Sequence, residues 1–386
     1  MKIVYYSSTS FADTDFPLIR EYQKMGVDVY FLIYLAPHNK RSTLIDIKSL
    51  IGKPAILHAS EYKEFDVYKD YVDLSKVYVI NSLESSVRSR NNIRLTFKVY
   101  SFIKKINPDV IHLLSPLDTF STILYRFRKI MVLTMHDPFP HTGESNARKT
   151  IFRNLAMRLV PKFILLNDIQ KEEFKKAYRI KEEQILVNKI GRFDYLDIWK
   201  KEPKIHGHNV LFFGRISPYK GIEYLCQAMV KVKHQVPDAS LTIAGGGKMY
   251  FDVSPYEKLD WVKIINRYVG MEELAGLLQN CALSVCPYID ATQSGVIMTS
   301  YSLCKPVVAT NVGGLGEMVE EGKTGLLVPP KDADALANAI TSLLRNDTAL
   351  DEMARNIQND YFVGDKSWKV IAKKYVEFYE NCGKCQ

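Results

Sequence analysis

Two short loops in the C-terminal half of the chain carry residues suited to holding an anionic group. The first follows the apolar stretch NVLFF and contains Gly214, Arg215 and Lys220, with Pro218 setting the turn between the two cations. Glycine lets the backbone approach a ligand, arginine offers a planar fork of donors for phosphate oxygens, and lysine offers a compact charge. This pattern fits a phosphate site, and it also fits a solvated basic pair beside a tight turn.

The second loop joins a predicted strand at 283–286 to an apolar helix that starts near Ser294 and Gly295. Another predicted strand, 307–310, is followed by Gly313, Gly314 and a further helix start. Each helix start carries unpaired N–H groups and roughly half a positive charge. Two of them close together favour an anion, and diphosphate is the usual one.

Three segments taken together resemble glycosyltransferase family four, the large retaining family with the GT-B fold. They are GRISPYKG at 214–221, GGG at 245–247, and the run from SGV through KPVVAT and VGGLGEMV to TGLLVPP. The resemblance covers the C-terminal half well and the N-terminal half weakly. It implies an α/β fold of two Rossmann-like parallel-sheet domains facing each other across a cleft, with a C-terminal helix that crosses back to the first domain.

The same resemblance implies a chemistry that needs no protein nucleophile, because a donor phosphate oxygen helps to take the acceptor proton. Arg215 and Lys220 would then neutralise the departing phosphate, and the backbone N–H groups of Gly295 and Val296 would hold sugar or phosphate. His136, at the end of the apolar run MVLTM, corresponds to a histidine near the donor sugar. The alternative is a loop histidine that ends a strand.

The chain departs from the family at its Glu-x7-Glu motif, where Thr292 and Ser300 stand in place of the two glutamates. Neither hydroxyl can act as a bidentate acceptor, so Gln293 and Ser294 are expected to take over the sugar contacts. An inactive homologue therefore remains an alternative. The complete expectation is catalytic roles for His136, Arg215 and Lys220; donor contacts from Gly214, Gly245, Gly246, Thr292, Gln293, Ser294, Gly295, Val296 and Ser300; and acceptor or sugar contacts from Asp137, His141 and Glu317.

No motif predicts a metal site or a cofactor. The Asp13-Thr14-Asp15 run has the form of a metal-binding DxD, but Asp15 is better placed to cap the helix predicted from Phe16. The glycines at 245–247 lack the last glycine of a dinucleotide fingerprint, since Tyr250 occupies it. Cys382 and Cys385 form a terminal CxxC without the second ligand pair that structural zinc requires.

Strands and helices alternate along almost the whole chain, which predicts parallel sheets. We expect an acceptor-side domain at 1–202, a nucleotide-sugar domain at 203–365 and a crossover helix at 366–386, joined by a polar linker near 200–208. Strands are expected at 2–6, 27–35, 77–80, 109–114, 130–135, 163–166, 185–188, 210–213, 240–244, 262–265, 283–286, 307–310 and 325–328. Residues 36–76 follow no clear period.

Charge is distributed unevenly between the two halves. Residues 1–200 contain 32 Lys or Arg and 22 Asp or Glu, a net +10, whereas residues 201–386 contain 20 and 21, a net −1. The basic residues concentrate at 88–105 and 148–162, which indicates either helices that dock on an anionic membrane or ordinary solvated faces. The strand-like start and the lack of a long apolar run predict a cytoplasmic protein, peripheral on the inner face of the membrane.

These patterns favour transfer of a sugar from a UDP- or GDP-sugar to a glycan acceptor, lipid-linked, in cell-surface polysaccharide biosynthesis. A nonhydrolysing sugar-nucleotide epimerase would share the fold and is the main alternative. A nucleic-acid-binding protein is the weaker one, because the excess charge lies on an α/β domain with no recognised nucleic-acid module.

Overall fold

The computed structural model describes residues 1–86, 88–136, 138–139, 147–201, 207–291 and 293–381. The chain divides into two compact units: unit 1 holds Met1–Ile190 and the segment from Trp368 onward, and unit 2 holds Gly191–Ser367. The division thus falls before the expected boundary at 202. The residues after Ile190 pack within unit 2, where the Phe193 amide donates to the Met298 carbonyl at 3.3 Å.

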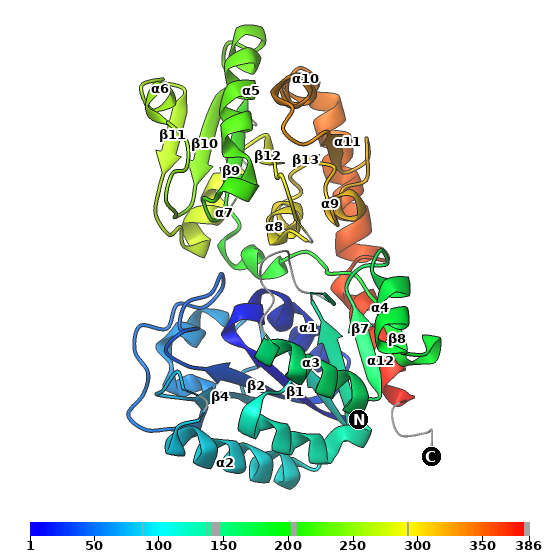
Figure 1. Cartoon of the computed structure of the whole chain (residues 1–386). Helices are drawn as coiled ribbons and strands as arrows, with labels where there is room; N and C mark the ends of the chain where they lie inside the picture. Colours follow the sequence, from blue (N-terminus) through cyan, green and yellow to red (C-terminus); the bar gives the residue numbers. More distant parts are fainter. Residues whose placement is uncertain (87, 137, 140–146, 202–206, 292, 382–386) are drawn as a thin grey trace. The chain divides into compact units, whose positions relative to one another are not determined.

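Unit 1 is built on an eight-stranded sheet in the order β3-β4-β2-β1-β5-β6-β7-β8 (Figure 1). All neighbouring strands are parallel except β3, which pairs antiparallel with β4. The strands are β1 Lys2–Ser8, β2 Asp28–Leu35, β3 Ala55–His58, β4 Val77–Asn81, β5 Val110–Leu113, β6 Met131–Met135, β7 Lys162–Leu165 and β8 Ile185–Val187. Near-continuous apolar runs form these strands because helices cover both faces of such sheets.

The connections of unit 1 are helices and 3₁₀ turns. The helices are α1 Ala12–Lys24, α2 Arg90–Ile106, α3 Ala147–Leu159 and α4 Lys171–Tyr178, and the longest 3₁₀ run is η4, Thr119–Ile130. In α2 the buried positions Leu95, Val99, Ile103 and Ile106 recur with helical spacing, so one stripe of the helix packs on the core. The opposite stripe is left for charged residues.

Strand β3 lies in the region for which the sequence predicts no element. It is short, and a side chain of β4 holds the segment that precedes it. The Asn81 amide group donates to the carbonyls of Ile51 and Lys53 at 2.6 and 3.0 Å, and it accepts from the Tyr62 hydroxyl at 2.8 Å. The position of β3 thus depends on Asn81, which is distant in sequence. The local pattern of apolar residues contains no information about such a contact.

Unit 2 contains a six-stranded parallel sheet in the order β11-β10-β9-β12-β13-β14. Its strands are β9 Asn209–Phe213, β10 Ser240–Ala244, β11 Val262–Ile265, β12 Leu283–Cys286, β13 Val307–Thr310 and β14 Gly325–Val328. Its helices are α5 Ile222–Gln235, α6 Ser254–Glu257, α7 Met271–Gln279, α8 Gly295–Ser302, α9 Leu315–Met318, α10 Ala333–Leu344 and α11 Asp347–Gln358. Two α/β units with parallel sheets were expected, and this expectation is confirmed.

The last helix, α12 Trp368–Glu380, follows unit 2 in sequence but packs in unit 1. Its Ile371 carbonyl accepts from the Asn188 amide group at 3.1 Å, and its Phe378 carbonyl accepts from the Lys162 ammonium at 3.1 Å. The Tyr379 hydroxyl lies 2.8 Å from that of Tyr22 in α1. The expected crossover helix is therefore present, and buried hydrogen bonds hold it.

Candidate functional site

His136 lies at the carboxyl edge of the unit 1 sheet, directly after β6. Its ring stacks on Phe11, with ring centroids 4.3 Å apart and planes at 18°. Phe11 ends the 3₁₀ turn Thr9–Phe11 that follows β1, so the two rings come from the ends of two strands, β1 and β6, that flank β5. Ligands of parallel sheets bind at this edge. The expected partners Asp137 and His141 lie outside the described residues.

The Asp13-Thr14-Asp15 run lies in the first turn of α1 and not before it. The helix begins at Ala12, so the expectation that Asp15 caps it is wrong. Asp15 is fully buried and accepts from the Tyr5 hydroxyl at 2.9 Å, and burial holds the pKa of this carboxyl well above its usual value. Burial also raises the pKa of Asp13 to about 6. In the described part of the chain no three His, Cys, Asp or Glu side chains are grouped to hold a metal ion.

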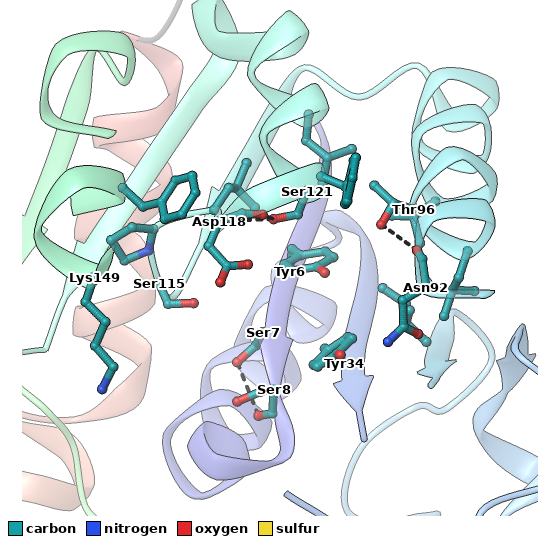
Figure 2. Close-up of a pocket in the computed structure, with 18 of the residues that line it drawn as sticks. Tyr6, Ser7, Ser8, Tyr34, Asn92, Thr96, Ser115, Asp118, Ser121 and Lys149 are labelled. Carbon is teal, nitrogen blue, oxygen red and sulfur yellow. Dashed lines mark hydrogen bonds between the residues drawn. The ribbon is translucent and has the colours of Figure 1, made fainter. Parts of the chain in front are cut away.

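A pocket of about 520 Å³ opens at the same edge of unit 1 (Figure 2). Figure 2 shows Ser115 and Lys149 on one side, Asn92 and Thr96 of α2 on the other, and Asp118, Tyr6 and Tyr34 between them. Its lining comes from the ends of β1, β2, β4 and β5 and from α2, η4 and α3. No motif in the N-terminal half of the sequence predicts this pocket.

In unit 2 the loops after β9 and β10 are pressed together at their glycines. Gly214 has φ of +117° and Gly245 of +153°, a region that favours glycine. A side chain at Gly245 would meet the Gly214 carbonyl oxygen at 1.9 Å, and one at Gly247 would meet that of Ile216 at 2.3 Å. These glycines therefore allow close backbone contact between the two loops. The contact sets the backbone position of Arg215, the residue after Gly214.

Lys220 is a buried cation, with 8% of its surface exposed. Its ammonium lies 3.5 Å from the centroid of the Tyr288 ring and 4.9 Å from that of Tyr219. It forms no ion pair with a carboxylate among the residues that the structure describes, and burial lowers its pKa. A buried ammonium without a carboxylate is costly, and the two tyrosine rings offset part of that cost.

Arg215 is exposed beside Lys220, and its guanidinium contacts the Tyr219 hydroxyl at 3.4 Å. Burial alone would raise the pKa of Tyr219, but the hydrogen bond from Arg215 and the charge of Lys220 more than offset this, so its pKa is lowered. Both cations thus contact the side chain of Tyr219. Tyr219 and Tyr288 escaped the sequence analysis, although both flank residues that it singled out.

The loop after β12 joins this group through its backbone. The Ile289 amide donates to the Tyr219 carbonyl at 2.7 Å, and a side chain at Gly221 would meet the Pro287 carbonyl oxygen at 2.0 Å. The Tyr288 hydroxyl lies 3.1 Å from that of Ser294, the residue before α8. A series of contacts therefore runs from the loop after β9 to the start of α8, through Lys220, Tyr288 and Ser294.

The start of α8 offers polar groups that its own chain does not use. The Gln293 side-chain nitrogen is buried and has no hydrogen-bond partner among the described residues. Ser294 precedes the helix without a side-chain cap. Val296 lies against Gly214, whose added side chain would stand 3.5 Å from its methyl group. The structure thus brings Gly214, Gln293, Ser294 and Val296 to one edge of unit 2; Thr292 lies outside the described residues.

Ser300 does not reach that edge. It is fully buried, its hydroxyl donates to the Val296 carbonyl at 2.8 Å, and it lies 2.6 Å from the Ser284 hydroxyl of β12. The hydroxyl of Ser300, from which a donor contact is expected, is therefore not exposed at that edge. Thr299 is equally occupied, since it donates to the Gly295 carbonyl at 2.7 Å.

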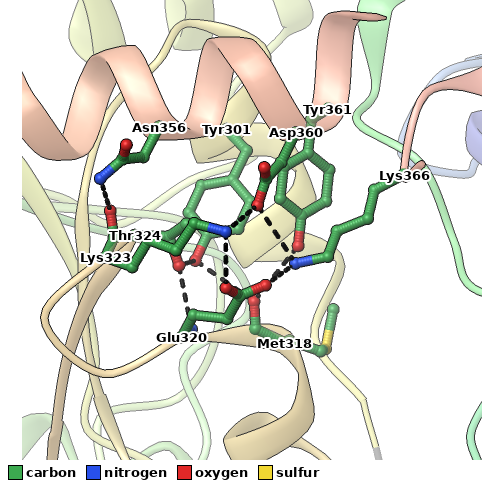
Figure 3. A network of polar contacts seen from close by, with 9 residues as sticks. All are labelled: Tyr301, Met318, Glu320, Lys323, Thr324, Asn356, Asp360, Tyr361 and Lys366. Carbon is green, nitrogen blue, oxygen red and sulfur yellow. Dashed lines mark hydrogen bonds and ion pairs between the residues drawn. The ribbon is translucent and has the colours of Figure 1, made fainter. Parts of the chain in front are cut away.

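Glu317 lies half-buried in the four-residue helix α9, next to Met318, whose sulfur accepts from the Ser294 amide at 3.4 Å. The Met318 carbonyl accepts from the Tyr301 hydroxyl at 3.2 Å. Figure 3 shows the adjoining polar network, in which Glu320 pairs with Lys366 and Lys323, and Asp360 pairs with both lysines. The loop before α8 is therefore braced by the segment that ends unit 2.

Comparison with known proteins finds glycosyltransferase matches for both halves of the chain. Residues 17–188 match the family model Glycosyltransferase Family 4, and residues 207–346 match the model Glycosyl transferases group 1. A glycogen synthase of Mycobacterium tuberculosis is 28% identical over 182 residues, 46% of this chain and 44% of that one. A D-inositol 3-phosphate glycosyltransferase of Corynebacterium urealyticum is 32% identical over 44% of this chain and 42% of that one. These matches span less than half the length of the curated relatives.

Solved structures agree in fold over the whole chain. A glycosyltransferase from Rickettsia africae superposes with a TM-score of 0.69 at 18% identity, covering 100% of both chains. HepE from Anabaena, solved in complex with UDP-glucose, superposes with a TM-score of 0.65 at 18% identity, covering 98% of both. The two parallel-sheet units and the crossover helix therefore constitute the GT-B fold, as the sequence predicts.

Proposed function

We propose that this chain, which has the GT-B fold and matches glycosyltransferase models in both halves, transfers a sugar from a UDP- or GDP-sugar to a glycan acceptor. The observation that carries the proposal is Lys220, a buried ammonium without a carboxylate partner in the described residues, beside the exposed Arg215. A nucleoside diphosphate would supply the missing negative charge. The HepE structures, which contain UDP or UDP-glucose, support this choice of donor.

The reaction is proposed to proceed with retention and without a metal. The two cations would stabilise the diphosphate as it gains charge and leaves, which is the work that a metal does in other transferases. No carboxylate stands at the two motif positions, so a donor phosphate oxygen would take the acceptor proton. His136, the unused amide of Gln293 and the backbone at Gly295 would orient the sugar.

We further propose that the protein acts on a lipid-linked acceptor at an anionic membrane surface, in cell-surface polysaccharide biosynthesis. Helix α2 supports this, because its exposed stripe carries Arg90, Arg94, Phe97, Lys98 and Lys105. None of these four cations is in an ion pair within the described chain. Lys162, by contrast, is engaged with α12, so the second basic cluster is less available. No helix of the described chain is long and apolar enough to cross a bilayer.

The proposal is tested by thermal unfolding of the protein with a panel of nucleotide-sugars, followed by a transfer assay with the one that stabilises it most. Stabilisation by one UDP- or GDP-sugar and formation of a glycosylated product are expected. Epimerisation of the donor without transfer would select the epimerase alternative. Binding without either reaction would indicate a sugar-nucleotide-binding homologue, in keeping with the missing glutamates.

A further inference from the structure

The middle of the unit 1 pocket holds a hydrogen-bond acceptor and a donor that the described chain leaves unused. Asp118 pairs with Arg148 through Oδ2 at 3.0 Å, whereas its Oδ1 has no hydrogen-bond partner among the described residues. The Tyr6 hydroxyl also makes no hydrogen bond within the described ranges. Burial raises the pKa of the Tyr6 phenol, and the charges of Tyr34 and Asp118 add to this shift, so the phenol keeps its proton and can donate. Figure 2 shows Asp118 and both phenols in the middle of the lining.

These two groups define what a ligand must bring. Asp118 needs a donor, because an ionised carboxylate only accepts hydrogen bonds, and Tyr6 needs an acceptor. A hydroxyl group both donates and accepts, so a molecule with several neighbouring hydroxyls satisfies both side chains at once. A phosphate dianion can accept from Tyr6 but brings no proton for Asp118 and carries the same sign of charge, and a hydrocarbon chain serves neither group. The polar middle of the pocket is therefore suited to a ligand that carries several hydroxyls.

Accessible aromatic side chains line the same pocket. Phe120 of η4 is 42% exposed, and Phe152 of α3 is partly exposed. A pyranose ring presents C–H groups on its faces, and these pack favourably on the electron-rich face of an aromatic ring. The cavity of about 520 Å³ falls within the range of roughly 300–1,000 Å³ that is usual for small-molecule sites. One cavity thus offers aromatic rings for the faces of a sugar and polar groups for its hydroxyls.

The backbone around Asp118 fixes its carboxylate in this position. The next residue, Thr119, has φ of +47°, which is uncommon for a β-branched side chain. The Thr119 hydroxyl accepts from Arg148 at 2.6 Å. The Ser121 hydroxyl accepts from the Asp118 amide at 2.9 Å and donates to the Asp118 carbonyl at 2.6 Å. Because these contacts hold Asp118 before a ligand arrives, binding would cost little further ordering of this side chain.

We infer that the pocket binds a saccharide unit of the acceptor, with Asp118 accepting from one of its hydroxyls, Tyr6 donating to another and Phe120 packing against its ring. The inference rests on the proposed function, because it locates the glycan part of the acceptor and names the groups that recognise it. A neutral saccharide should be sufficient for binding, since the three contacts require only hydroxyl groups and a sugar ring.

The experiment measures saccharide binding to the full chain by NMR titration, with saturating UDP present to occupy the donor site. The probes are maltotriose and the methyl α-glycosides of glucose, galactose, mannose and N-acetylglucosamine, and at least one of them should bind. Asp118→Asn should weaken its binding by about tenfold or more, because hydrogen bonds to a carboxylate are stronger than neutral ones. Tyr6→Phe and Phe120→Leu should each weaken it by about fivefold. Matched controls at positions that do not line the pocket, Asp70→Asn, Tyr30→Phe and Phe97→Leu, should bind as wild type.

Thermal unfolding identifies variants that fail to fold. If Asp118→Asn does, Tyr6→Phe carries the test, because it removes a single hydroxyl. Wild-type affinity in a folded Asp118→Asn or Tyr6→Phe protein would overturn the inference, and so would displacement of the saccharide by UDP or the failure of every probe to bind. Binding of UDP is measured separately on wild type and on each variant. Saccharide binding that depends on Asp118 and Tyr6, in a protein that does not bind UDP, would support the pocket assignment and refute the donor proposal.

Discussion

The hydroxyl of Tyr379 in α12 lies 2.6 Å from Nδ1 of His112 in β5, across 267 residues of sequence. The other ring nitrogen of His112 lies 2.7 Å from the Thr134 hydroxyl of β6. The imidazole is fully buried, and both nitrogens are hydrogen-bonded. A series of hydrogen bonds thus joins the last helix to the centre of the unit 1 sheet. The neutral imidazole can complete this series because one of its nitrogens donates and the other accepts.

Acid should weaken the protein through this histidine. Burial, with a smaller contribution from His136, lowers the pKa of His112 to about 3. Above pH 6.5, the pKa of this histidine in the unfolded chain, the imidazole is neutral in both the folded and the unfolded state. Below pH 6.5 the imidazole binds a proton in the unfolded chain but stays neutral in the folded chain. The free energy of unfolding should therefore fall by about 1.4 kcal/mol for each pH unit between roughly 6.5 and 3.

Urea unfolding of wild type and His112→Gln between about pH 7 and pH 4 measures this effect. The variant should be less stable at neutral pH but should lose less stability on acidification. His234→Gln, an exposed control, should keep the wild-type slope. Equal slopes for wild type and His112→Gln would show that another group governs the acid response.

Removing one cation from the proposed diphosphate site should slow transfer sharply. Arg215→Ala should reduce turnover by about 10²–10³, as expected for the loss of one group that stabilises the leaving phosphate. Because Arg215 is exposed, the variant should unfold at nearly the wild-type temperature. Steady-state kinetics with the donor found by screening provides the measurement, with Arg355→Ala on α11 as an exposed control. Wild-type turnover by Arg215→Ala would refute the assignment.

The burial of Ser300 changes what its replacement should do. Ser300→Glu would place a carboxylate between α8 and β12, where no exposed surface remains, and should cost several kcal/mol of stability or prevent folding. Since no glutamate reaches the ribose at this position, the protein should also tolerate a 2′-deoxy donor. Calorimetry with UDP, GDP and their 2′-deoxy forms is the measurement. A large loss of affinity on removing the 2′-hydroxyl would mean that another residue binds the ribose.

Docking of α2 on a membrane should depend on salt and on lipid charge. Each basic residue near an anionic surface contributes about 1 kcal/mol, and salt screens this attraction. Co-sedimentation with anionic vesicles should be strong at low salt and weak at high salt. The triple variant Arg94→Gln, Lys98→Gln, Lys105→Gln should lose most of it. The exposed control Lys53→Gln, Lys63→Gln, Lys69→Gln should behave as wild type, and equal binding by both triple variants would refute a role for α2.

Transfer should persist without divalent metal. Arg215 and Lys220 already supply positive charge where the leaving phosphate would sit, so exhaustive EDTA treatment should leave the rate unchanged. Activity that disappears with EDTA and returns with Mn²⁺ would contradict this prediction. Elemental analysis of the purified protein distinguishes a tightly held metal from none.

Much of the fold could be predicted because the signals are local. Apolar residues dominate the strands of both sheets, and the predicted strands 240–244, 262–265, 283–286, 307–310 and 325–328 match β10 to β14 in their bounds. The helix spacing of Leu95, Val99 and Ile103 is equally local. Strand β3 was missed because Asn81, which holds the segment before it, is 28 to 30 residues away in sequence. The start of α1 was expected at Phe16 but lies at Ala12.

The sequence by itself determined the alternation of strands and helices, the glycine-rich loops and the cations that follow β9, because residue type and spacing carry that information. Only the tertiary structure decided which of the candidate side chains are buried and which partners they have. It buried Ser300 against Ser284, placed Lys220 over Tyr288 with no carboxylate partner in the described ranges, and assembled the unit 1 pocket from segments that share no motif. The exposure of a side chain and its contacts depend on which strands lie next to each other in the sheet. Long-range packing determines this strand order.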